Sequence, residues 1–212
     1  MSDKPRLQVA IDTLTVEEAV TLAETLRDVV DLIEAGTPFV KRYGIGVVTR
    51  LREVSGLPIV ADLKIVDGGP FEAQLAVAAG ASFVTVLATA ADATVSGVVE
   101  VAHAGGVEVV SDLLGVHDLP HRIGQLERLG VDYLGVHAGT DARLAGDTDL
   151  MSEMGIVTAT SQMRLVVAGG LNANSIPGVL AYRPAVVVVG SAITGANDPV
   201  AAAMAIRSVI DG

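Results

Sequence analysis

The sequence contains eight short apolar runs, spaced at intervals of roughly 20 to 30 residues. Each run is continuously apolar, which is typical of β-strands that are covered on both faces. The spacing leaves room for one helix between successive runs, as parallel pairing of neighbouring strands requires. The runs predict strands at residues 7–12, 30–36, 58–65, 83–88, 107–114, 133–139, 165–170 and 186–193.

Helical patterns occupy the spaces between these runs. Thr15 and Glu18 form a capping-box signature at the start of the first helix. Asp198 followed by Pro199 is a second start signal, because proline suits the first helical position. Apolar residues at helical spacing also predict helices at 71–79, 93–104, 119–129 and 199–210, whereas 147–160 predicts only a short or irregular helix.

The order of these elements defines the expected fold. No linker, low-complexity segment or charge block divides the chain, so residues 1–212 are expected to form one domain. Eight βα units predict an α/β fold of the (β/α)8 TIM-barrel type. A doubly wound open sheet is the alternative, but such sheets usually have fewer strands. In a barrel, the active site lies at the C-terminal ends of the strands.

Composition excludes several classes of function. The net charge of −11 and the lack of a basic patch argue against a nucleic-acid partner. No apolar run approaches the roughly 18 residues that span a membrane, and the N-terminus lacks a signal-peptide pattern, so we expect a cytoplasmic protein without a membrane partner. Because the chain has no cysteine, disulfides and thiolate metal sites are excluded.

Charged side chains gather at the ends of the predicted strands. A single acid at a strand end is usually a helix cap or half of a salt bridge. Five strands that carry Asp, Glu or His at the same end favour a functional site instead. The candidates are Asp12, Glu34, Asp62, Lys64, Asp67, Asp112 and His137.

Three of these residues suggest a chemistry by themselves. Strand alternation puts Asp62 and Lys64 on one face, and a lysine among carboxylates stays protonated, so it can stabilise an anion that develops in a reaction. A plain salt-bridge cluster is the alternative. His137 would share the cavity with these charges, which makes proton transfer a credible role.

Two further sites are expected from position. Glu34 and Asp62 would face each other on adjacent strands, and an oxygen-only ligand set suits Mg2+, unless Lys64 alone neutralises both acids. Gly170, Gly190 and Ser191 follow the seventh and eighth strands, where barrels often bind phosphate. Glycine pairs also form ordinary tight turns, so position is what favours this interpretation.

The motif Asp62-x-Lys64-x-x-Asp67 resembles the signature of the orotidine 5'-phosphate decarboxylase superfamily. Within it, the stretches 7–12, 33–38, 61–69, 136–139 and 167–170 are similar to the 3-hexulose-6-phosphate synthase family, and the resemblance extends from about Leu7 to the C-terminus. The related 3-keto-L-gulonate 6-phosphate decarboxylase family has arginines where this chain has Thr140 and Ser191. The chain departs from the synthase pattern at residues 87–92, at Gly68 and at Ser191.

The resemblance implies a reversible, Mg2+-dependent aldol condensation of formaldehyde with ribulose 5-phosphate. It also implies a role for each candidate residue: Glu34 and Asp62 hold the metal, His137 is the base, Lys64 stabilises the enediolate, Asp12 and Asp112 orient substrate hydroxyls, and Gly170, Gly190 and Ser191 hold the phosphate. The family further implies a homodimer in which Asp67 reaches into the partner's site. A sugar-phosphate decarboxylase and a non-catalytic sugar-phosphate-binding barrel are the alternatives.

Overall fold

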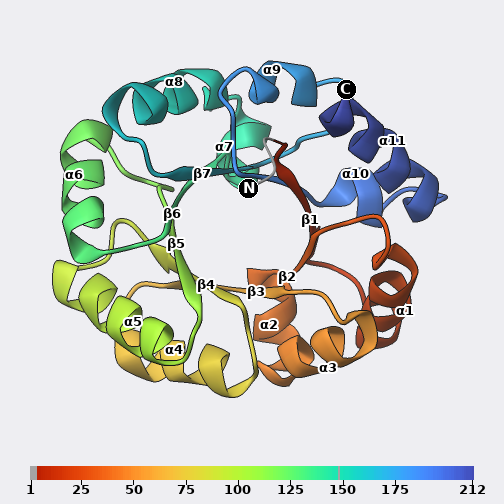
Figure 1. The fold of residues 1–212 in the computed structure, drawn as a ribbon, viewed down its shortest axis with the longest axis horizontal. Coiled ribbons are helices and arrows are strands. Elements are labelled where there is room, and N and C mark those ends of the chain that lie inside the picture. Colours follow the sequence, from red (N-terminus) through yellow and green to blue (C-terminus); the bar gives the residue numbers. More distant parts are fainter. Residues whose placement is uncertain (1–3, 148) are drawn as a thin grey trace.

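The computed structural model describes residues 4–147 and 149–212. Eight parallel strands form a closed barrel in the order of the sequence, and helices surround it (Figure 1). The predicted (β/α)8 barrel is therefore confirmed. The strands are β1 (Arg6–Ile11), β2 (Leu32–Ala35), β3 (Ile59–Ile65), β4 (Phe83–Leu87), β5 (Glu108–Asp112), β6 (Tyr133–His137), β7 (Arg164–Ala168) and β8 (Val186–Val189).

Closure of the barrel determines where the strand ends lie. β1 pairs in parallel with β2 on one side and with β8 on the other, in a register that joins Arg6 to Val186 and Val9 to Val189. A closed sheet has no free edge, because every strand pairs with a neighbour on both sides. Because all the strands run in the same direction, their C-terminal ends form one rim.

The helices confirm the start signals found in the sequence. The Thr15 side chain accepts a hydrogen bond from the backbone N–H of Glu18 in a complete capping box, and Asp198 caps the last helix. The helices are α1 (Val16–Leu26), α2 (Thr37–Tyr43), α3 (Gly46–Ser55), α4 (Gly69–Ala78), α5 (Asp92–Ala104), α6 (Leu119–Leu129), α7 (Thr140–Ala145), α8 (Leu150–Thr160), α9 (Ile176–Leu180), α10 (Ser191–Thr194) and α11 (Pro199–Asp211). Within the described residues, none of them is long and apolar enough to cross a membrane.

Two predictions differ from the structure by more than two residues. The eighth strand was expected to run to residue 193, but it ends at Val189, and the backbone turns at Gly190 into α10. Residues 147–160 were expected to form a short or irregular helix. Asp149 instead caps an eleven-residue helix, α8, and position 148 lies outside the described residues.

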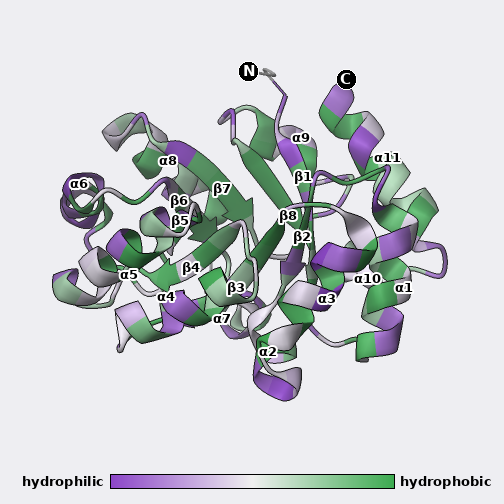
Figure 2. Cartoon of the chain, turned by 60° about the horizontal axis from the view of Figure 1, so that its bottom comes forward, coloured by the Kyte–Doolittle hydropathy of each residue, from purple (hydrophilic) through white to green (hydrophobic). Residues whose placement is uncertain are grey.

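Two apolar cores support the barrel. The larger one lies between the strands and the outer helices, and the smaller one fills the barrel interior with residues such as Val60, Phe83 and Tyr133. At the N-terminal end of the barrel, Arg6 and Arg164 both donate hydrogen bonds to the Tyr133 hydroxyl and lie near its ring. These contacts close that end of the barrel interior. The strands are accordingly apolar in Figure 2, while the helices alternate between polar and apolar residues.

Candidate active site

A cavity of about 650 Å3 occupies the C-terminal end of the barrel. Figure 2 shows α2 and α7, which follow β2 and β6, at this end of the molecule, opposite the C-terminus. Asp67 does not line the cavity but lies exposed after β3. The other predicted site residues all line it: Asp12, Glu34, Asp62, Lys64, Asp112, His137, Gly170, Gly190 and Ser191.

The Lys64 ammonium joins two buried carboxylates that come from different strands. Its Nζ lies 3.0 Å from Asp62 of β3 and 2.9 Å from Asp112 of β5. Burial alone would lower the pKa of Lys64, but the two neighbouring carboxylates raise it above its usual value. Lys64 therefore keeps its positive charge inside the cavity.

Local backbone geometry allows Lys64 to make this contact. The β3–β4 register shifts between Ala61 and Ile65, and Lys64 adopts a left-handed conformation with φ of 47°. Such a conformation is rare for a residue with a side chain and is maintained only where its surroundings hold it. Here Thr85 of β4 accepts a hydrogen bond from the Lys64 backbone N–H and donates one to Asp62.

Asp112 connects the lysine to His137. One carboxylate oxygen lies 2.9 Å from the Lys64 Nζ and 3.2 Å from the His137 Nδ1, and the other accepts the backbone N–H of Leu114. Burial alone would raise the pKa of Asp112, but the hydrogen bond from His137 and the charge of Lys64 lower it to about 2.

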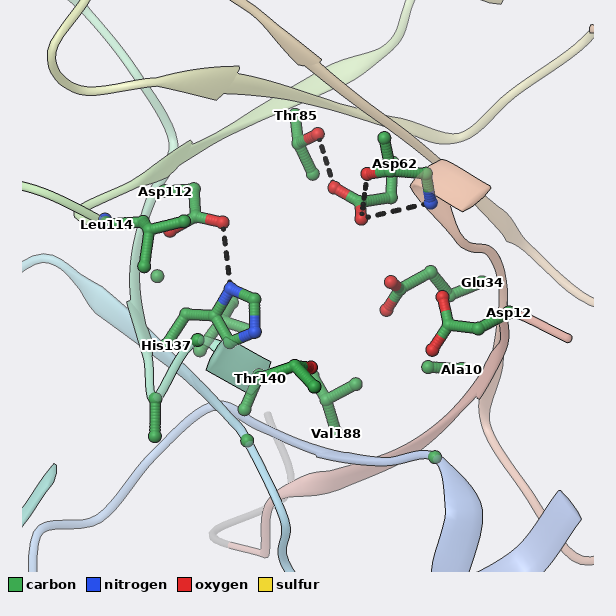
Figure 3. A pocket seen from close by; sticks show the side chains of 18 of the residues that line it. Ala10, Asp12, Glu34, Asp62, Thr85, Asp112, Leu114, His137, Thr140 and Val188 are labelled. Atoms are coloured by element: carbon green, nitrogen blue, oxygen red, sulfur yellow. Dashed lines mark hydrogen bonds and ion pairs between the residues drawn. The ribbon is translucent and has the colours of Figure 1, made fainter. Parts of the chain in front are cut away.

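An ionised carboxylate can only accept a hydrogen bond, so His137 Nδ1 must carry the hydrogen in this contact. In the neutral ring, Nε2 then has a free lone pair. Figure 3 shows this second nitrogen on the side of the ring away from Asp112. The pair Asp112–His137 is therefore arranged as a base and the group that orients it.

The opposite wall of the cavity is acidic. Figure 3 shows the Asp12 and Glu34 carboxylates close together, across the cavity from His137. Burial, reinforced by the charge of Asp62, raises the pKa of Glu34 to about 8 and also raises the pKa of Asp12. Gly36 makes room for the Asp12 carboxylate, because a Cβ atom at position 36 would lie 2.0 Å from one of its oxygens.

These acids fit a Mg2+ ion that keeps part of its shell for other ligands. Among the described residues, no three acidic or histidine side chains converge as a preformed metal cage. Mg2+ commonly takes one or two carboxylates together with water or substrate oxygens, so a pair of carboxylates such as Glu34 and Asp62 would be enough to hold it. Burial is the main reason that the pKa of Glu34 is raised, and a cation between the two acids would relieve the repulsion from Asp62 that adds to it.

Several residues of the cavity were not predicted from the sequence. Thr85 and Gln8 are polar residues in otherwise apolar strands, and Gln8 donates a hydrogen bond to Glu34. Gln8 alternates with Ala10 and Asp12, so strand periodicity could have identified it. No comparable signal exists for Thr37, whose hydroxyl lies 2.7 Å from Asp62 because α2 begins at that point, or for Arg143 on α7.

Known proteins share this barrel over nearly its whole length. The protein named 3-hexulose-6-phosphate synthase 3 from Staphylococcus saprophyticus is 42% identical over 207 residues, which cover 97% of this chain and 99% of that protein. The crystal structure of 3-hexulose-6-phosphate synthase from Salmonella typhimurium matches with a TM-score of 0.93 at 39% identity, covering 97% and 98% of the two chains. That of 3-keto-L-gulonate-6-phosphate decarboxylase from Vibrio cholerae has a TM-score of 0.87 at 30% identity and covers 98% of each chain.

The resemblance carried by Asp62, Lys64 and Asp67 is thereby confirmed at the level of the family. Residues 5–206 match the orotidine 5'-phosphate decarboxylase / HUMPS family, which includes the whole barrel from β1 to β8. The chain belongs to the orotidine 5'-phosphate decarboxylase / HUMPS family.

Proposed function

We propose that this protein is a cytoplasmic carbon–carbon lyase of the 3-hexulose-6-phosphate synthase type, which joins formaldehyde to D-ribulose 5-phosphate reversibly. The observation that carries the proposal is the continuous contact from Asp62 through Lys64 and Asp112 to His137. It holds a fixed positive charge and a proton acceptor on one wall of a cavity. The name shared by relatives at 35–42% identity supports the same reaction.

The first step is removal of a proton from C1 of the ketose phosphate. His137 Nε2 takes this proton, because Asp112 holds the ring by its other nitrogen. The electron pair of the broken C–H bond moves toward the C2 carbonyl oxygen, giving an enediolate. The imidazolium that forms is stabilised by the ionised Asp112.

The negative charge of the enediolate is then stabilised by Lys64, whose ammonium is already fixed before the substrate arrives. Glu34 and Asp62 would hold a Mg2+ ion, whose Lewis acidity would add to this stabilisation. C1 of the enediolate attacks the formaldehyde carbon and a C–C bond forms while the C=O π bond breaks. The former formaldehyde oxygen takes up the proton that His137 removed from C1, which regenerates the neutral imidazole. The product is a hexulose 6-phosphate, and the reverse sequence is the lyase reaction.

A sugar-phosphate decarboxylase is the second candidate. Loss of CO2 from a 3-keto acid also leaves an enediolate, and the decarboxylase of Vibrio cholerae is 30% identical to this chain. Thr140 and Ser191 line the cavity and are uncharged. From the resemblance, we expect the decarboxylases to have arginines at these two positions. This difference favours the synthase reaction.

The same proposal includes a homodimer. Asp67 is exposed and follows Val66 in the chain, and α4, which begins at Gly69, carries Phe71 and Leu75. Val66 and Phe71 are 56% and 82% exposed. Exposed apolar side chains of this size around one acid are typical of an interface. We propose that a second copy covers them and that Asp67 enters the partner's cavity.

Formaldehyde consumption with ribulose 5-phosphate tests the reaction. We expect the wild-type protein to consume formaldehyde with Mg2+ and not with EDTA. His137→Ala should lower kcat by about 10²- to 10⁴-fold, as expected for loss of a general base, and Lys64→Ala by roughly 10²- to 10³-fold. His117→Ala is the control, because His117 is exposed and does not line the cavity. No formaldehyde loss in either condition would contradict the synthase proposal, and a bound sugar phosphate without turnover would favour the non-catalytic barrel.

Mg2+ affinity should depend on pH through Glu34. With a pKa of about 8, Glu34 is protonated at pH 6 and must lose its proton to bind the ion. The association constant should therefore rise by about tenfold per pH unit below pH 8 and level off above it. Calorimetry in buffers of different ionisation enthalpy measures both the constant and the released proton. An affinity independent of pH between 6 and 8, or unchanged in Glu34→Gln, would argue against this ligand.

Mixing two inactive variants tests the role of Asp67. If Asp67 acts in the partner's cavity, hybrids of Asp67→Asn with Lys64→Ala contain one intact site. Random exchange should then restore at most about a quarter of wild-type activity. Lys64→Ala mixed with His137→Ala is the matched control, because both residues line the same chain's cavity and no hybrid site is intact. Equal recovery in both mixtures, or full activity of Asp67→Asn alone, would contradict the shared site.

A further inference from the structure

Arg143 lies over the glycine that follows β7. It belongs to α7 and lines the cavity together with Gly170, Gly190 and Ser191. An ideal Cβ atom on Gly170 would be 2.9 Å from Arg143 Cδ and 3.3 Å from Cζ, so the end of the arginine side chain rests directly on this glycine. The missing side chain at Gly170 therefore makes room for the guanidinium at this part of the rim.

Most of the charged side chains that line the cavity are negative, and Arg143 is positive. Four carboxylates line the cavity, from Asp12, Glu34, Asp62 and Asp112, and its lysine is already shared by two of them. Within residues 4–147 and 149–212, the Arg143 guanidinium makes no hydrogen bond or ion pair. A doubly charged anion that entered this cavity in a protein of net charge −11 would be repelled unless a cation met it.

We infer that Arg143 binds the phosphate group of the substrate and is the side chain that selects phosphorylated sugars. The inference rests on the proposed function for the identity of the sugar. A guanidinium offers two parallel N–H donors that match phosphate oxygens, and it remains charged at all relevant pH values. Gly170 lies next to the Arg143 side chain, and because it has no side chain, an anion can approach its backbone closely.

The position of Arg143 on α7 agrees with this role. Thr140 and Arg143 are three residues apart on α7, and side chains at this spacing lie on the same side of a helix. Both line the cavity. From the resemblance, we expect the related decarboxylases to have an arginine at position 140. In this chain the cation comes from one turn further along the same helix.

Arg143→Gln provides the direct test, because it removes the charge and keeps a polar side chain of similar length. We expect KM for ribulose 5-phosphate to rise by roughly 10- to 100-fold, the effect of losing a charge-assisted contact to phosphate. The value of kcat should change far less, because Arg143 does not touch Lys64 or His137 in the described structure. Arg143→Lys should recover part of the loss, since a lysine restores the charge but not the two-pronged geometry.

Inorganic phosphate supplies a measurement that is independent of turnover. Its dissociation constant, obtained by calorimetry or 31P NMR, should weaken by the same factor in Arg143→Gln. Arg50→Gln is the matched control, because Arg50 is an exposed arginine of α3 that does not line the cavity. Thermal unfolding of both variants should match that of the wild type, since both side chains are exposed.

The two measurements separate the inference from the proposed function. If the wild-type protein shows no synthase activity but binds phosphate through Arg143, the proposed reaction fails and the phosphate site stands. If Arg143→Gln and Arg50→Gln bind phosphate equally well, or if the wild type does not bind phosphate at all, the inference is overturned. The inference would also be overturned if the Arg143→Gln variant kept the wild-type preference for ribulose 5-phosphate over ribulose.

Discussion

The ammonium group of Lys64 lies between buried carboxylates of β3 and β5, and the catalytic end of the barrel is organised around this contact. Each acid would be unfavourable in the interior without a cation beside it. Together the three groups form a charged unit that a closed apolar barrel can enclose. The cost of this arrangement is visible in the backbone, in the shifted β3–β4 register and the left-handed conformation of Lys64.

The contact also explains how the remaining groups acquire different roles. Asp112 is kept ionised by Lys64 and His137, so it can hold the imidazole in one orientation. Glu34 lies across the cavity, where burial and the charge of Asp62 hinder its ionisation. One wall therefore supports proton transfer, and the other has acids that a divalent cation would stabilise. The glycines after β7 and β8, together with Arg143, leave a third part of the rim for an anion.

Sequence patterns predicted the barrel well because its strands are covered on both faces. Continuous apolar runs such as Val186–Val189 are easily distinguished from their surroundings, and the polar residues that end the strands meet at one rim for geometric reasons. The end of β8 was misplaced, because Ala192 and Ile193 extend the apolar pattern beyond the turn at Gly190. Apolar pattern alone does not distinguish a strand end from a short helix that follows it.

The site was predictable only in part. Asp62, Lys64 and Asp112 could be named because charges on apolar strands are conspicuous. The hydroxyl of Thr37 and the guanidinium of Arg143 reach the cavity through the paths of α2 and α7, which sequence periodicity does not determine. The role proposed for Asp67 requires a second chain, because Asp67 does not line the cavity of its own chain.

Exchange of the C1 hydrogen of ribulose 5-phosphate with D2O, followed by NMR without formaldehyde, tests the central claim most directly. It isolates proton removal from C–C bond formation. The contact from Lys64 through Asp112 to His137 predicts that the wild-type protein incorporates deuterium at C1, that Lys64→Ala does so slowly, and that His137→Ala does not. Exchange at the wild-type rate in His137→Ala, or its absence in a wild-type protein that still consumes formaldehyde, would contradict the account.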